Sequence, residues 1–136
     1  MKLSSYAHFA PLLLRITLGA LFIAHLYWKF AILPGGLGQW WSNFAANGYP
    51  SFVPYYVFSA EIAGALLLIP GIFVRWASLY AVPMMLGAAH FWGTRNGFYF
   101  TSSGAELPLV WSVMLVLQVM LGGGPYQLMA STRASA

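Results

Sequence analysis

The ionisable side chains of this 136-residue chain are few, and several lie inside or beside long apolar stretches. Ionisable groups inside a hydrocarbon layer are costly and usually serve a function, so they are the first candidates for chemistry. Both acidic residues of the chain belong to this set. Its members are His25, Lys29, Glu61, His90, Arg95 and Glu106.

These residue types suit the binding and protonation of a small polar molecule. Lys29 and Glu61 would form a buried ion pair in which each charge offsets the desolvation of the other. His25 and His90 would donate and accept hydrogen bonds and carry protons near neutral pH. Such a set would bind the carbonyl oxygens of a quinone and manage the protons of its reduction. It would equally bind a small anion, or serve only as a polar clamp that fixes the register of the helices.

Several other chemistries are excluded or disfavoured. The chain has no cysteine, so it has no disulfide, thiolate metal site or thiol nucleophile, and electrons would have to come from a bound cofactor or a partner. Haem b between His25 and His90 is disfavoured, because charged side chains crowd the wide apolar slot that haem needs. We predict no covalent cofactor and no metal site. The net charge of +4 comes from scattered cations, so we predict no nucleic-acid partner.

Four apolar segments must position these residues. Hydrophobic residues make up 60% of the chain and charged residues 6%. A soluble domain carries roughly 25% charged residues, so this surface is predicted to face lipid. A hydrocarbon core of ~30 Å takes about 20 apolar residues of helix. The sequence therefore predicts an all-α fold, a polytopic membrane four-helix bundle forming a single domain over residues 1–136, with spans at residues 12–33, 52–73, 76–92 and 105–121.

A short amphipathic helix is predicted between the first two spans, over residues 37–48. Its apolar residues, Leu37, Trp40, Trp41 and Phe44, recur at the i, i+3, i+4 and i+7 positions of one helical face. Polar residues fill the other positions, which is typical of a helix lying in the membrane interface. Two roles are open for it: an anchor that fixes the depth of the bundle, or a lid over an opening between helices.

The distribution of cations predicts the orientation. An even number of spans places both termini on one side, together with Lys2, Arg75 and Arg133. The positive-inside rule assigns that side to the cytoplasm. Arg15 lies near the same side, and we expect it, like Arg75, to extend toward the lipid headgroups. Arg15 also interrupts the first apolar run, which disfavours a cleaved signal peptide.

Helical geometry places the candidate residues in the outer half of the bundle. At ~1.5 Å per residue, four of them lie within about one turn of a common depth and would floor a pocket: His25, Lys29, Glu61 and His90. Arg95 and Glu106 would lie at its mouth. The seven-residue spacing of Arg15, Phe22 and Lys29 puts them on one face of the first span, which should face the bundle interior.

Short motifs through most of the chain resemble, in order and spacing, those of the DoxX family of small bacterial membrane proteins. The matching pieces are Leu14-Arg15, Gly19, Phe22, His25, Lys29, Ala60-Glu61, Gly64, Leu66-Leu67-Leu68, Gly71, Arg75, His90, Asn96-Gly97-Phe98, Gly104-Ala105-Glu106 and Gly124-Pro125-Tyr126. The resemblance implies a four-helix bundle in the bacterial inner membrane and an association with oxidoreductase systems. Some relatives are quinone-linked subunits of sulfur-compound oxidation, others work beside redox-defence enzymes, and related vertebrate proteins act in receptor assembly. One departure is Ser102-Ser103-Gly104-Ala105, where a Gly-Gly-aromatic run is common before the acid.

Two hypotheses from different classes follow. In the first, the chain is an integral membrane subunit of an oxidoreductase system that binds quinone or a similar small molecule in the polar layer. Its activity would be that of a quinone-linked oxidoreductase subunit, with electrons supplied by a redox protein partner. In the second, it is a non-catalytic membrane scaffold or assembly factor whose aromatic surfaces bind another membrane protein. Both place the chain in a lipid bilayer, and both leave a homo-oligomer open.

Overall fold

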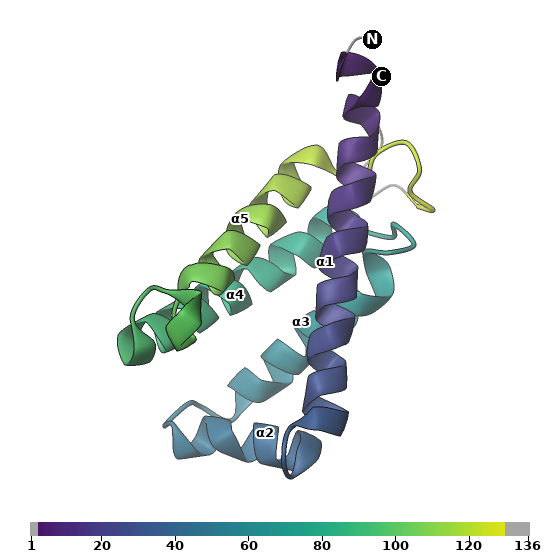
Figure 1. The fold of residues 1–136 in the computed structure, drawn as a ribbon. Coiled ribbons are helices and arrows are strands. Elements are labelled where there is room, and N and C mark those ends of the chain that lie inside the picture. Colours follow the sequence, from purple (N-terminus) through teal and green to yellow (C-terminus); the bar gives the residue numbers. More distant parts are fainter. Residues whose placement is uncertain (1–2, 130–136) are drawn as a thin grey trace.

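The structure, a computed structural model, describes residues 3–129 of the chain, and the regular elements in this range are all helices (Figure 1). The all-α prediction is therefore confirmed. A 3-10 helix, η1, precedes the first α-helix, and a π-helical turn, η2, extends it. The elements in chain order are η1 (Leu3–Phe9), α1 (Ala10–Tyr27), η2 (Trp28–Ile32), α2 (Gly36–Ala46), α3 (Phe52–Leu67), α4 (Val74–Asn96), η3 (Phe100–Ser102) and α5 (Glu106–Leu121).

One continuous helical stretch in the described part of the chain is long and apolar enough to cross a membrane. It covers Tyr6–Ile32, has 27 residues, and contains α1 and η2. The helices α3 and α5 are also apolar but have 16 residues each. That is about 24 Å of helix, shorter than a hydrocarbon core of ~30 Å. The helix α4 has 23 residues and carries Pro83 in its interior. Each of these four helices overlaps one predicted apolar segment.

The helix α3 ends at Leu67, before the predicted boundary at residue 73, because Pro70 and Gly71 form the turn into α4. Gly71 has a φ of +82°, a left-handed conformation that glycine adopts without strain. The segment after α5 returns to this turn. The backbone N–H groups of Leu128 and Met129 donate to the carbonyl oxygens of Pro70 and Gly71, both at 3.0 Å.

The helices pack as two pairs, α1 on α3 and α4 on α5, which are joined by the contact of α3 with α4. In Figure 1 the α4–α5 hairpin diverges from α1 toward the end of the molecule where α2 lies. Gly64 allows the close approach of α1 and α3, since an added Cβ would lie 2.7 Å from Cε2 of Phe22. The buried core includes Leu18, Phe22, Ala60, Leu68, Ala81 and Leu115.

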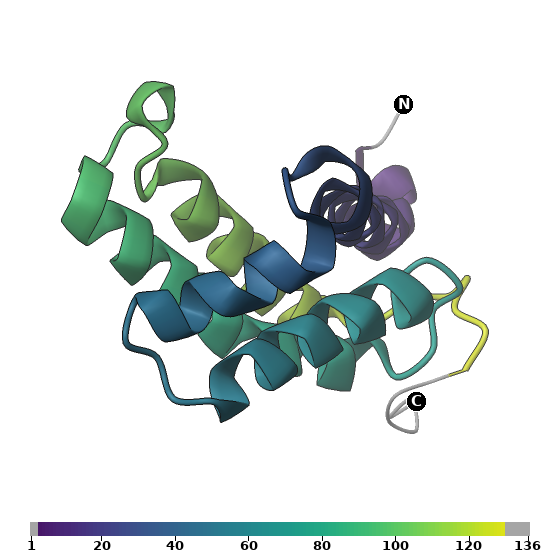
Figure 2. The same ribbon diagram turned by 90° about the horizontal axis from the view of Figure 1, so that it is seen from below.

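The helix α2 lies across one end of the bundle, as the view from below in Figure 2 shows. Its bounds lie within two residues of the predicted helix at residues 37–48. Gly35 precedes it and Gly36 is its first residue, with φ values of +86° and +63°, and Gly48 follows it with a φ of +83°. The chain therefore turns sharply at both ends of α2. Trp40 is the residue of α2 that is buried against the rest of the molecule.

Candidate functional site

Lys29 and Glu61 form an ion pair inside the bundle, between η2 and α3. Their side chains are 3% and 8% exposed, so both charges are almost fully removed from the surface. Burying a charge is costly, and attraction to a partner offsets that cost only when the two groups are in contact. The predicted contact between these two side chains is confirmed.

A local irregularity at the end of α1 positions Lys29. The turn Trp28–Ile32 is π-helical, and the Leu33 N–H donates to the Trp28 carbonyl at 2.8 Å. Turns of this type are rare and often occur at functional sites. Lys29 nevertheless stays on the buried face of the helix with Arg15 and Phe22. The prediction from their seven-residue spacing is therefore confirmed.

Trp40 of α2 covers the ion pair. The Nζ of Lys29 lies 4.7 Å from the centroid of the Trp40 ring, which is a cation–π contact. Trp40 is itself only 9% exposed, and its ring lies 4.8 Å from that of Phe44 and 6.2 Å from that of Phe58. The pair is therefore enclosed by three elements, with aromatic rings on the side of α2.

His25 lies one turn before Lys29, at the edge of the buried face of α1. Its imidazole is exposed and packs edge-on against Trp111 of α5, with the ring centroids 4.8 Å apart. Trp111 also contacts Phe22, at 5.1 Å between centroids. The structure therefore places His25 at the junction of α1 and α5.

Arg95 lies at the opposite end of α2 from Lys29. Its Nη2 donates to Oδ1 of Asn47, the C-cap of α2, at 3.2 Å, and its Nη1 donates to the Phe91 carbonyl, also at 3.2 Å. The guanidinium carbon lies 3.7 Å from the centroid of the Phe91 ring. A second cation thus contacts α2, whereas the position of Arg95 at the mouth of a pocket stays a prediction.

His90 and Glu106 lie on the α4–α5 hairpin. His90 is exposed, because the inward positions of α4 at this level are taken by Met85 and Ala89. Glu106 is the first residue of α5, where a carboxylate interacts favourably with the positive end of the helix dipole. Within residues 3–129, no three histidine or acidic side chains lie close enough to hold one metal ion. The six candidate residues thus separate into a buried pair, a cation of α4 that contacts the end of α2, and three residues elsewhere.

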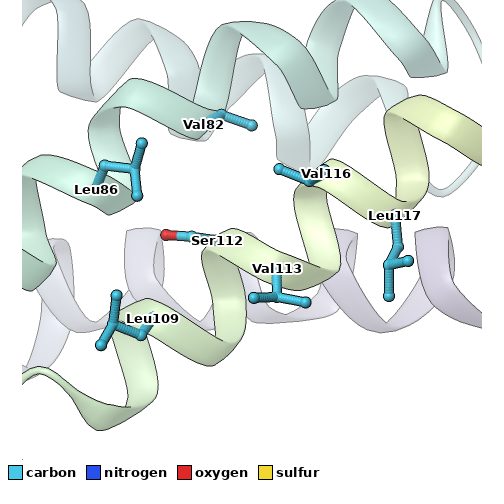
Figure 3. Close-up of a pocket in the computed structure, with 7 residues that line it drawn as sticks. All are labelled: Val82, Leu86, Leu109, Ser112, Val113, Val116 and Leu117. Atoms are coloured by element: carbon cyan, nitrogen blue, oxygen red, sulfur yellow. The ribbon is translucent and has the colours of Figure 1, made fainter.

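A groove of about 250 Å³ lies between α4 and α5, apart from the ion pair. Figure 3 shows its walls, with Ser112 as the single polar residue. The Ser112 hydroxyl donates to the Pro108 carbonyl at 2.8 Å, so it is already hydrogen-bonded. The lining residues are Val82, Leu86, Leu109, Ser112, Val113, Val116 and Leu117. None of the six candidate residues lines this groove.

Arg15 does not extend to the headgroups, and that prediction is wrong. It is 1% exposed, and its guanidinium donates to backbone carbonyl oxygens of two separate segments. The acceptors are Leu68 at 3.0 Å, Ile69, Gly123 at 3.2 Å and Tyr126 at 2.9 Å. The planar guanidinium group suits this arrangement, since its five N–H donors point in several directions. The seven-residue spacing with Phe22 and Lys29 was the sequence signal for this burial.

Tyr56 of α3 makes a further polar contact, with the backbone of α4, which we did not predict from the sequence. Pro83 lacks an N–H and disturbs the hydrogen-bond ladder of α4. The Tyr56 hydroxyl enters the ladder there, since it donates to the Tyr80 carbonyl at 2.6 Å and accepts from the Met84 N–H at 3.1 Å. The two helices are therefore joined at the proline by a side chain that replaces a backbone contact.

Comparison with known proteins agrees with this helical architecture. A family model described as DoxX matches residues 10–95, a range that contains α1, α2, α3 and nearly all of α4, with both members of the ion pair. A protein of Haemophilus influenzae, described as uncharacterized, is 32% identical over 131 residues, which cover 90% of this chain and 90% of that protein. No solved structure matches the chain. The chain belongs to the DoxX family of membrane proteins.

Proposed function

We propose that the protein is a multi-pass inner-membrane subunit of an oxidoreductase system, and that it binds a quinone or a similar small molecule beside Lys29 and Glu61. The observation that carries the proposal is the buried ion pair itself, with Lys29 in a π-helical turn and the Trp40 ring over its ammonium group. Charged residues at membrane depth usually mark a substrate, ion or proton path. Aromatic rings next to the pair supply flat surfaces against which a quinone ring can stack.

The multi-pass arrangement rests on four helices of differing length. The stretch Tyr6–Ile32 spans a bilayer without adjustment. The 16-residue helices α3 and α5 are accommodated if the bilayer thins locally around them. The helix α2, with Trp40 and Trp41 among its apolar residues, then lies in the interface on the side away from the termini.

The side chains divide the chemistry among them. The Nζ of Lys29 donates a hydrogen bond to a carbonyl oxygen of the bound molecule, and the Glu61 carboxylate balances the charge of the Lys29 ammonium group. His25, one turn away on the exposed edge of α1, exchanges protons with the surroundings. Electrons come from a partner protein, because the chain has no cysteine to carry them. Positioning and protonation are therefore the tasks of this chain.

A fluorescence titration tests the proposal. Trp40 lies on the pair, so a short-chain ubiquinone added to the protein in lipid nanodiscs is expected to quench tryptophan emission saturably. The double variant Lys29→Gln/Glu61→Gln keeps the packing but removes both charges, and we expect it to bind at least about tenfold more weakly, the equivalent of one lost charged hydrogen bond. Thr17→Val, on the exposed face of α1, is the control and should bind normally. Saturable quenching that the double variant does not alter would contradict this site.

A non-catalytic scaffold is the second candidate, and two observations favour it. His90 and Glu106 do not join the ion pair, and the groove between α4 and α5 is apolar apart from the satisfied Ser112 hydroxyl. In this function the ion pair only fixes the register of the helices, and the α4–α5 face binds another membrane protein. Isolation of the native complex separates the two candidates. Quinone together with a redox enzyme supports the first, whereas a stable client protein without quinone supports the second.

A further inference from the structure

The ion pair cannot be reached in the conformation described above. Lys29 and Glu61 are both buried, and Trp40 closes the side on which α2 lies. The ring of Trp40 is held between the Lys29 ammonium group at 4.7 Å and the Phe58 ring at 6.2 Å. A molecule that binds beside the pair must therefore displace Trp40, and Trp40 can move far only if α2 moves.

The chain at the two ends of α2 has the backbone features of a hinge. Gly35, Gly36 and Gly48 all have positive φ values, between +63° and +86°. Gly36 and Gly48 are also loosely surrounded: an added Cβ would meet only backbone oxygens at 3.7 Å and 3.9 Å at Gly36, and nothing within 4 Å at Gly48. Hinges are commonly a few residues at the ends of an element that absorb changes in φ and ψ. These glycines flank α2 on both sides.

Two cations from other elements hold α2 against the bundle. Lys29 holds its middle through the Trp40 ring, and Arg95 of α4 holds its C-terminal end through a hydrogen bond of 3.2 Å to Asn47. Ring contacts add to these, such as Trp41 with Tyr55 at 4.7 Å between centroids. Trp40 is the single residue of α2 that is buried, so the helix places little of its surface in the core. The helix can thus leave the bundle without unfolding it.

We propose that α2 is a lid over the Lys29–Glu61 pair, with Trp40 as its plug and Arg95 as its latch. Opening turns α2 about the glycines and carries Trp40 away from the Lys29 ammonium group. A flat, mostly apolar molecule with a hydrogen-bond acceptor then occupies the position of the Trp40 ring, since that position combines an aromatic wall with a cation. The identity of that molecule rests on the function proposed above, whereas the movement of α2 does not.

Distance measurements between spin labels test the movement. The chain has no cysteine, so Asn43→Cys on α2 and Thr17→Cys on α1 give a single labelled pair on exposed positions. In liposomes we expect a main short distance and a minor longer one. Trp40→Ala should raise the ratio of the longer to the shorter population by roughly thirtyfold, the equivalent of one desolvated cation–π contact. The pair Thr17→Cys with Thr94→Cys, which omits α2, is the control and should keep one distribution.

Arg95→Gln provides a second variant, because Arg95 is exposed and its substitution leaves the core intact. It should also raise the longer population. Equal, narrow Asn43–Thr17 distributions in the native chain and in both variants would overturn the lid. Adding a short-chain ubiquinone separates the two proposals. If the variants open α2 but no quinone binds, the lid stands and the quinone site falls. If quinone binds with no change in the distance, and Lys29→Gln/Glu61→Gln abolishes that binding, the lid is wrong.

Discussion

At the scale of single residues, the bundle holds its two buried cations in different ways. Lys29 has a carboxylate partner, so its charge is balanced by Glu61. Arg15 is surrounded instead by backbone carbonyl oxygens at the ends of α3 and α5. A carboxylate balances charge, whereas carbonyl groups satisfy hydrogen bonds while the net charge remains. The two sites should therefore respond differently to substitution.

Removal of one member of the ion pair should destabilise the bundle strongly. Glu61→Ala leaves the Lys29 ammonium group buried without its partner, and we expect it to lower the free energy of unfolding by about 3–5 kcal/mol. The measurement is reversible unfolding in mixed micelles with increasing sodium dodecyl sulfate. Lys29→Ala combined with Glu61→Ala should cost less than the two single changes added together. Additive costs would mean that the two side chains do not interact.

Arg15→Lys should fail to replace the arginine even though it preserves the charge. A lysine ammonium group is compact and cannot reach carbonyl oxygens from both Leu68 and Tyr126 at once. We expect a loss of at least about 2 kcal/mol in the free energy of unfolding, since hydrogen bonds from a charged group contribute ~1.5–3 kcal/mol each. Limited proteolysis should also show earlier cleavage within residues 122–129. Native stability and native protease resistance in Arg15→Lys would contradict this role.

At the scale of helices, the contact of α1 with α3 depends on a glycine, which has no side chain to keep the two helices apart. Gly64→Ala would place a Cβ within 2.7 Å of Cε2 of Phe22, so the two helices must separate. We expect this change to cost about 1–3 kcal/mol, as overpacking of a core does. The smaller ring-free side chain of Phe22→Leu should recover part of the loss in the double variant.

Gly87→Ala is the matched control for that experiment. Gly87 lies in α4, and an added Cβ there meets nothing within 4 Å. Because alanine is the better helix former, this change should be neutral or should stabilise the protein by about 0.5–1 kcal/mol. If both glycine substitutions had the same effect, helix propensity rather than the α1–α3 contact would explain Gly64→Ala.

The positions of the helices along the chain were largely predictable from the sequence, but the rotation of each helix about its own axis was not. Apolar runs and glycine–proline boundaries locate α1, α2, α3 and α5 to within a few residues, apart from the early end of α3. Rise per residue then gives the depth of a side chain, yet depth says nothing about the direction in which it points. His90 has the expected position along α4, but Met85 and Ala89 take the inward face. Lys29 and Glu61 could be paired from sequence because α1 carried a second signal, the seven-residue spacing of its buried face.

At the scale of the whole molecule, the burial of Lys29 and Arg15 strengthens the prediction of orientation. Neither is a loop cation, since both lie within the helical stretch Tyr6–Ile32 and are buried. Arg95 then remains as the cation exposed at the α2 end. Arg75 precedes most of α4 at the other end, and the sequence predicts Lys2 and Arg133, which lie outside the described residues, on the same side of the membrane. The terminal side then has three cations and the α2 side has one. This difference favours a cytoplasmic location for both termini more clearly than a count that includes all six cations.

Topology reporters test that orientation. Alkaline phosphatase fused after Arg133 should be inactive and green fluorescent protein fused there should fluoresce, whereas alkaline phosphatase inserted after Gly48 should be active. Lys29→Gln/Glu61→Gln should leave all three results unchanged, because the ammonium group it removes lies inside a helix and its carboxylate partner is removed with it. Arg75→Glu, which reverses a cation at the terminal side, should weaken the bias and produce a mixed signal. An active phosphatase after Arg133 in the native chain would reverse the orientation and place α2 and its lid movement on the cytoplasmic side.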